Sequence, residues 1–170
     1  LLDARWLRDD ERLVVRAVAA DGTSRLYAVG RDGSAPTAIT PAGLDVAAVG
    51  WAVAPNGREV AVSSADGVQL FAVSGGAPER PLPGSRSRWT VVGWISSGLL
   101  LAETPVDGGR IERVDPASGN ATRWADIHPP DPAGVMNDDL TTLRVTPDGR
   151  SYGHSWHRAL SDLYLIDGWR

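Results

Sequence analysis

Trp51-Ala52-Val53-Ala54-Pro55-Asn56-Gly57-Arg58 is the stretch that decides the fold of this chain. An alternating apolar segment runs into an Asn-Gly turn, which is among the strongest short signals for a β-hairpin. Related stretches stand at 6–11, 94–98 and 143–150. Neighbouring turns are roughly 40 to 50 residues apart, the repeat length of one four-stranded propeller blade. The sequence therefore predicts an all-β chain, a β-propeller of about four blades of four antiparallel strands.

The segments between the turns predict the individual strands, because alternation of apolar residues is typical of half-buried β-structure. We expect the blades at about 1–42, 43–86, 87–136 and 137–170, with only Leu1 to Asp3 ahead of the first strand. The further strands are expected at 12–18, 24–30, 36–40, 46–54, 59–64, 68–73, 80–82, 89–95, 99–103, 110–115, 121–125, 139–146, 151–156 and 161–167.

The last blade is one strand short in this prediction. Closed propellers protect such an edge, often with a strand from the other terminus. We therefore expect the chain to be part of a larger ring, of roughly six to eight blades. The strand expected at 161–167 would then be an exposed edge suited to self-association. Between the third and fourth blades, 126–138 contains three prolines and is expected to be an irregular loop.

Composition excludes several classes of function. The net charge of −4 gives no basic surface for nucleic acid, and no apolar run approaches the ~18 residues needed to insert in a bilayer. The chain has no cysteine, which excludes disulfides and thiolate metal sites. It has no lysine either, so a P-loop or a Schiff-base enzyme is excluded within it.

One stretch matches a catalytic motif by letter only. Gly149-Arg150-Ser151-Tyr152-Gly153 has the G-x-S-x-G pattern of a nucleophile elbow. That elbow requires a helix after the serine, with the acid and then the histidine following in sequence. Here a strand pattern follows, and the only later acids, Asp162 and Asp167, come after the last histidine, His157. We expect no enzyme, no catalytic residue and no cofactor.

A metal site is not expected either. His154 and His157 are three residues apart, which places them on opposite faces of a strand. Asp131, Asn137, Asp138 and Asp139 could offer oxygens to calcium, but their spacing does not match an EF-hand loop. We keep His128, Asp131, Asn137 and Asp138 only as candidate binding residues of the long loop.

The binding surface is expected on the face that carries the longer loops between blades. The blade turns Asn56-Gly57 and Asp148-Gly149 should lie on the opposite face. Five cationic or titratable residues would give the loop face a capacity to bind anions: Arg86, Arg88, Arg110, His157 and Arg158. Trp6, Trp51 and Trp94 recur at one repeat position and are expected to pack between blades.

These turns and the tryptophans before them resemble WD40-like repeats of the TolB type. The resemblance covers essentially the whole chain, although Ser96-Ser97-Gly98 departs from the Pro-Asp-Gly pattern. The ending, 161–168, resembles the end of large bacterial proteins in which a serine/threonine kinase domain precedes an array of such repeats. This resemblance implies a non-catalytic sensor or interaction region on the extracytoplasmic side, with a protein or peptide partner.

Two other functions stay open at this point. The propeller could be the accessory domain of a peptidase or other hydrolase that controls substrate access. It could also be a periplasmic scaffold like TolB. The sequence does not separate these functions from a sensor module, and it does not identify the partner.

Overall fold

The computed structural model describes residues 2–9, 11–47, 50–76, 80–103, 109–137, 143–159 and 161. The described residues form strands and turns and no helix, and hence no helix long and apolar enough to cross a membrane. The predicted all-β class is confirmed.

Three antiparallel sheets of four strands follow one another along the chain, each in the order of its sequence. Blade 1 contains β1 (Asp3–Trp6), β2 (Arg12–Val18), β3 (Ser24–Gly30) and β4 (Thr37–Ala38). Blade 2 contains β5 (Trp51–Val53), β6 (Glu59–Ser64), β7 (Gly67–Ala72) and β8 (Arg80–Pro81). Blade 3 contains β9 (Trp89–Ile95), β10 (Gly98–Glu103), β11 (Gly109–Val114) and β12 (Ala121–Ile127).

The turns that join the first two strands of a blade are built by their own side chains. Asn56 Oδ1 accepts the Arg58 N–H at 2.9 Å, and Gly57 adopts a φ of 68°, a left-handed conformation that glycine takes without steric cost. In the fourth repeat Asp148 Oδ1 accepts the Arg150 N–H at 3.1 Å and the Thr146 hydroxyl at 2.6 Å. The hairpins predicted from Asx-Gly pairs at these two places are confirmed.

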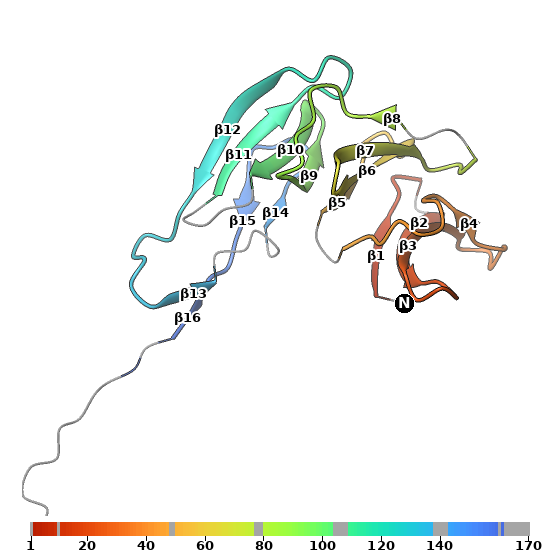
Figure 1. Cartoon of the computed structure of the whole chain (residues 1–170), viewed down its shortest axis with the longest axis horizontal. Coiled ribbons are helices and arrows are strands. Elements are labelled where there is room, and N and C mark those ends of the chain that lie inside the picture. The colour runs from red at the N-terminus through yellow and green to blue at the C-terminus, as the bar shows by residue number, and fades with distance from the viewer. Residues whose placement is uncertain are drawn as a thin grey trace, which may run out of the picture.

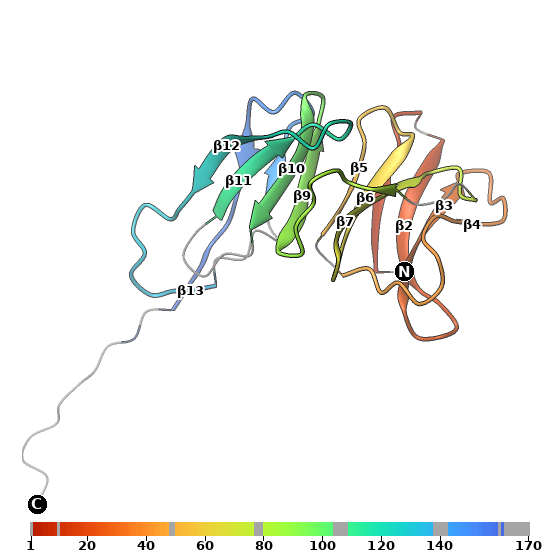
Figure 2. The ribbon, with the colours of Figure 1, turned by 45° about the horizontal axis from the view of Figure 1, so that its top comes forward.

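The blades are arranged as an arc with their first strands on the concave side (Figure 1). β1, β5, β9 and β14 (Arg144–Val145) lie inside the arc, whereas β4, β8 and β12 form its outer rim. Turned by 45°, the sheets stand side by side like the blades of a propeller (Figure 2).

Apolar side chains fill the space between consecutive blades. Blades 1 and 2 enclose a cluster that includes Val14, Leu26 and Trp51. Blades 2 and 3 enclose Leu70, Leu99 and Leu101, all at most 1% exposed. Since each inter-blade face is apolar, packing of sheet on sheet holds the arc together.

The fourth repeat departs from the prediction. In its described part there are two short pairs: β14 with β15 (Tyr152–Gly153), and β13 (Val135–Asn137) with β16 (His157–Arg158). The strands expected at 139–146 and 151–156 are therefore shorter, and residues 139–142 lie outside the described residues. Of the strand expected at 161–167, only Ser161 is described, and it is not in a strand.

The irregular loop expected at 126–138 is wrong at both ends. β12 continues to Ile127, because that side chain is 2% exposed and packs into the core of blade 3. β13 then forms because Val135 pairs with Arg158 and Asn137 pairs with His157, both in β16. Pairing across the chain thus overrides the local turn signal of the prolines.

Candidate functional site

A cavity of about 390 Å³ lies where the innermost strands of all four repeats meet. It corresponds to the central channel of a propeller. Its lining comes from β1, β5, β9 and β14 with Leu143: Asp3, Ala4, Arg5, Trp6, Ala52, Val53, Val92, Gly93, Trp94, Ile95, Leu143, Arg144 and Val145. Residues that are far apart in the sequence, such as Asp3 and Val145, therefore line the same cavity.

Arg5 is fixed at the wall of this channel. Its Nη1 donates to the Trp51 carbonyl at 2.7 Å, and its guanidinium lies 3.9 Å from the centre of the Trp51 ring. Asp3 lies 3.8 Å from Nη2. Burial lowers the pKa of Arg5; the Asp3 carboxylate raises it and the positive charge of Arg144 lowers it. Arg5 is thus a cation held partly out of water, with a second cation close enough to act on it.

Arg144 is the second cation of the channel. Its Nη1 donates to the Leu143 carbonyl at 2.8 Å. Matching hydrogen bonds close the hairpins of repeats 1, 2 and 4, from the N–H of Leu7, Ala54 and Thr146. By this alignment Arg5, Ala52 and Arg144 occupy one repeat position. Ala52 and Gly93 of the intervening blades line the same cavity, the first with a methyl group and the second with no side chain.

Two tryptophans stand at the edge of the channel. Trp6 is 56% exposed, so its expected packing between blades is wrong: β1 is the first strand of the arc, and no described blade covers that side of it. The expected common repeat position is wrong too, because the alignment of the hairpins places Trp6 with Val53 and Trp51 with Ala4. Trp94 is half-buried against the core between blades 2 and 3. Trp51, at 1% exposed, does pack between blades as predicted.

A second cavity, of about 580 Å³, opens on the face formed by the blade turns. It lies between blades 2 and 3 and shares Trp94 and Ile95 with the channel. Its other lining residues include Arg8, Asn56, Ser96, Ser97 and Asp115. The Ser96 N–H also donates to the Pro147 carbonyl at 2.8 Å, which joins the turns of repeats 3 and 4. These contacts place the turns of Asn56 and Pro147 around the same Ser96 turn, in agreement with the predicted turn face.

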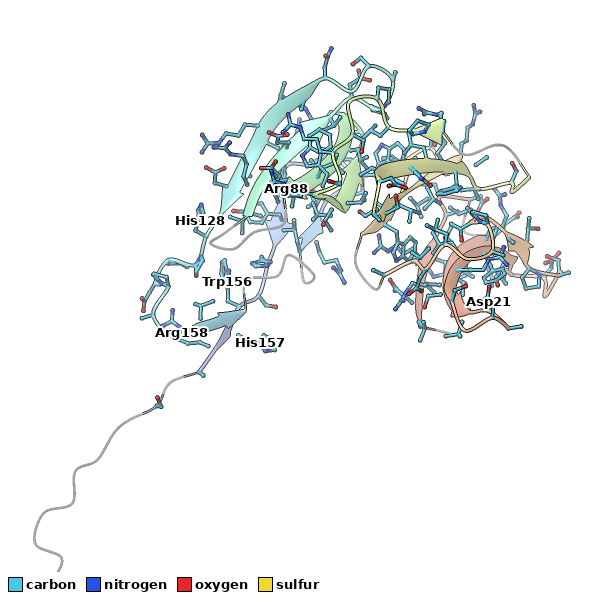
Figure 3. The ribbon with its side chains drawn as sticks, in the orientation of Figure 1. Asp21, Arg88, His128, Trp156, His157 and Arg158 are labelled. Carbon is cyan, nitrogen blue, oxygen red and sulfur yellow. The ribbon has the colours of Figure 1, made fainter. Side chains whose placement is uncertain are left out.

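The arginines predicted on the loop face are spread over blade 3. Arg86 lies 3.6 Å from Glu103 and 5.1 Å from the centre of the Trp89 ring. Arg110 is exposed and stands opposite Asp126 in the pairing of β11 with β12. Arg88, also exposed, precedes β9 (Figure 3). None of these three lines the channel or the turn-face cavity.

The predicted residues of the long loop and of β16 do come together. Arg158 donates to Asp131 twice, from Nη1 to Oδ2 at 3.0 Å and from Nη2 to the carbonyl at 2.6 Å. The Ala133 N–H and then the charge of Arg158 lower the pKa of Asp131. Asn137 pairs with His157 in the ribbon of β13 and β16, whereas His128 follows the end of β12, above the ribbon in the view of Figure 3. Asp138 lies outside the described residues.

The contacts between Arg158 and Asp131 hold the long loop against the ribbon of β13 and β16, and do not by themselves form a ligand site. The guanidinium of Arg158 is engaged by the loop itself, in two hydrogen bonds of ordinary length. Within the described part of the chain, no three His, Asp or Glu side chains are grouped to hold a metal ion.

The sequence matches no protein-family model and no curated protein. Solved structures do match. The chain superposes on TolB from Acinetobacter baumannii with a TM-score of 0.61 over 89% of this chain and 36% of that one, at 12% identity. A protein described as TolB from Agrobacterium tumefaciens gives 0.55 over 72% and 44%, at 17% identity. Oligogalacturonate lyase in complex with manganese gives 0.54 over 87% and 50%, also at 17% identity.

The chain has the fold of a TolB-type β-propeller. It spans half or less of the length of these solved structures. At such low identity the likeness shows the fold alone, and a fold that TolB shares with a lyase does not determine a function.

The residues of the channel were not among the sequence-based candidates. A signal for them exists in the sequence: aligning the turns of repeats 1, 2 and 4 puts Arg5 and Arg144 in one column, with Ala52 in the second repeat. Nothing short of the fold shows that this column faces the interior of the arc.

Proposed function

We propose that this chain is a non-catalytic binding segment of a β-propeller, and that its channel takes an acidic segment of a protein partner. The observation that carries the proposal is the pair of arginines, Arg5 and Arg144, from the first and the fourth repeat in one cavity with a single carboxylate, Asp3. Arg5 is partly buried and Arg144 is exposed, and an anion bound between two neighbouring positive charges is attracted by both. The guanidinium fork is suited to a carboxylate, which it can bind through two parallel hydrogen bonds.

The shape of the site favours a peptide over a small molecule. The channel and the turn-face cavity adjoin at Trp94 and Ile95, which line both, so an extended ligand could contact the two cavities together. Trp6 and Trp94 offer indole surface in these cavities, and tryptophan is enriched at protein interfaces. Ser96 and Ser97 add hydroxyl groups that can bond to a peptide backbone.

We also propose a setting for this module, at the C-terminal end of a bacterial multidomain protein of the kinase type, on its extracytoplasmic side. The support for this setting is the resemblance of the ending, 161–168, to that of such proteins. A periplasmic scaffold like TolB would use the same channel in the same way, and the binding experiment serves both settings.

Tryptophan fluorescence tests the proposal, because Trp6, Trp51 and Trp94 all lie at the channel or directly beneath Arg5. The probe is a ten-residue peptide rich in Asp and Glu, compared with its Asn/Gln counterpart at low salt. We expect saturable binding of the acidic peptide only. Arg144→Gln should weaken it at least about tenfold, since a hydrogen bond to a charged group contributes ~1.5–3 kcal/mol.

Arg150→Gln is the matched control. This arginine belongs to the same hairpin as Arg144, but its side chain is 87% exposed on the turn and outside the channel. The Arg150→Gln substitution removes one positive charge, as Arg144→Gln does, and should leave the affinity for the acidic peptide within about twofold of that of the parent chain. Equal binding of the two peptides, or equal losses in the two variants, would refute the proposal.

A further inference from the structure

Asp3, the one carboxylate among the lining residues of the channel, stands between two guanidinium groups. Side chains two residues apart on a strand, and those directly opposite on the next strand, lie on the same face of a sheet. Arg5 follows Asp3 by two residues on β1, and Arg16 stands opposite Asp3 on β2. The three side chains therefore share the face of blade 1 that carries Val14 and packs against blade 2.

The contact between Asp3 and Arg5 is loose. Asp3 Oδ2 lies 3.8 Å from Arg5 Nη2, which is longer than a hydrogen bond. The other oxygen, Oδ1, accepts the Ala4 N–H at 2.8 Å. The side chain of Asp3 is 39% exposed, so it can change rotamer without displacing the core. Asp3 thus weakens the positive charge that Arg5 presents to the channel, but leaves Nη2 open to another acceptor.

Arg16 is a second partner within reach of Asp3, and one of its N–H groups lacks an acceptor. Its Nη1 donates to the carbonyl of Val46, in the connection from blade 1 to blade 2, at 3.0 Å. Its Nε–H is buried without a hydrogen-bond partner in the described part of the chain. A buried donor without an acceptor is unfavourable, and opposite charges facing each other across two strands are stabilising. Arg16 would therefore gain from a closer approach of the Asp3 carboxylate.

A ligand carboxylate in the channel changes which arginine Asp3 favours. Bound between Arg5 and Arg144, it neutralises both cations and repels the carboxylate of Asp3. We propose that Asp3 is an internal counter-ion, which partly neutralises Arg5 in the free chain and moves to Arg16 when an acidic segment enters the channel. This role of Asp3 rests on the channel function proposed above. It makes Asp3 a residue that sets the affinity, because every anionic ligand has to displace it.

The affinity for the acidic ten-residue peptide, measured by tryptophan fluorescence at ~0.15 M salt, tests the proposal, since charges more than ~8 Å apart are largely screened there. Asp3→Asn removes the competing carboxylate and should raise the affinity about two- to fivefold, the range of a partly exposed ion pair. Asp66→Asn is the matched control, because Asp66 is exposed, lies outside the channel and precedes Gly67 in a turn that asparagine suits equally. This control should leave the affinity within about 1.5-fold.

Two further variants test where the carboxylate goes. In an Arg5→Gln chain, Asp3→Asn should no longer raise the affinity, because no Arg5 remains to be released. Arg16→Gln should weaken binding about two- to fivefold by removing the second partner of Asp3, although Arg16 does not line the channel. In the Asp3→Asn chain the same Arg16→Gln change should have no effect. Equal losses with and without Asp3 would assign Arg16 a structural role and would overturn the proposal.

The outcomes separate the role of Asp3 from the channel function. If the parent chain binds the peptide and Asp3→Asn binds it no more tightly, the counter-ion role is overturned and the channel function stands. An equal gain in Asp66→Asn, or in the Arg5→Gln chain, would overturn the counter-ion role in the same way. If only the Asp3→Asn chain binds, Asp3 blocks the site and the channel function of the parent chain fails. Binding by neither chain would overturn both.

Discussion

Gly119 provides the sharpest test of how blades 2 and 3 meet. It lies in the turn between β11 and β12, with a φ of 75°, and its N–H donates to the Asp115 carbonyl at 2.8 Å. A Cβ on this residue would overlap the carbonyl oxygen of Pro83, which belongs to the connection from blade 2 to blade 3. Both groups are backbone, so neither can swing aside. Gly119→Ala should therefore separate the turn from that connection.

The expected loss has two parts. Placing alanine in the left-handed region costs roughly 1–2 kcal/mol, and forcing an extra methyl group into a packed contact adds about 1–3 kcal/mol. Gly33→Ala isolates the first part, because Gly33 has a φ of 76° and a Cβ there would meet no atom within 4 Å. Both changes also restrict the unfolded chain equally. The difference between the two variants is thus the cost of the contact with Pro83.

Urea unfolding followed by tryptophan fluorescence measures both variants. We expect Gly33→Ala to lower the free energy of unfolding by about 1–2 kcal/mol and Gly119→Ala to lower it by about 2–5 kcal/mol. Equal losses in the two variants would refute the packing of the Gly119 turn on Pro83, and with it the described contact between these blades.

Three further outcomes are expected. Leu101→Ala, at a fully buried position between blades 2 and 3, should cost about 2–5 kcal/mol in urea unfolding, whereas a loss below that of Gly33→Ala would contradict its place in the core. The pKa of Asp115 is lowered chiefly by the hydrogen bond from the Ser118 N–H and then by that from the Ala117 N–H. The ionised carboxylate therefore stabilises the folded chain above the pKa of an unfolded Asp, ~3.9. This stabilisation is lost as the pH falls through the lower pKa of the folded state. The urea midpoint should drop across that range, and less so in Asp115→Asn; an equal drop would show that the turn does not bind the carboxylate. Arg158→Gln should speed proteolytic cleavage at 129–133 while changing global stability by less than about 1 kcal/mol, since the ion pair is exposed; unchanged cleavage would mean that Arg158 does not hold the loop.

The sequence is most informative where local signals and packing agree. The strands expected at 12–18, 24–30, 59–64 and 89–95 have those bounds in the structure. Each is bounded by turn residues and packs on a neighbouring blade, so alternation and burial specify the same register. The outer strands β4 and β8 are shorter than expected, whereas the outer strand β12 is longer, because Ile127 packs into the core of blade 3.

Sequence reasoning fails where distant segments determine the structure. β13 forms through pairing with β16, more than twenty residues later, which no local pattern in the proline-rich stretch indicates. The candidate site shows the same limitation more strongly. Arg5 and Arg144 are ordinary strand residues until the arc brings the first and fourth repeats to one cavity, whereas Arg158, a conspicuous cation beside two histidines, is engaged by Asp131.

A double-mutant cycle at Arg5 and Arg144 tests the central claim most directly. The affinity for the acidic peptide is measured for the parent chain, for Arg5→Gln, for Arg144→Gln and for the double variant, with the Asn/Gln peptide as the reference. If both guanidinium groups bind one anionic segment in the channel, the two losses should be coupled by well over ~0.5 kcal/mol, the limit within which independent sites add. Additive losses within that limit would contradict a shared channel site.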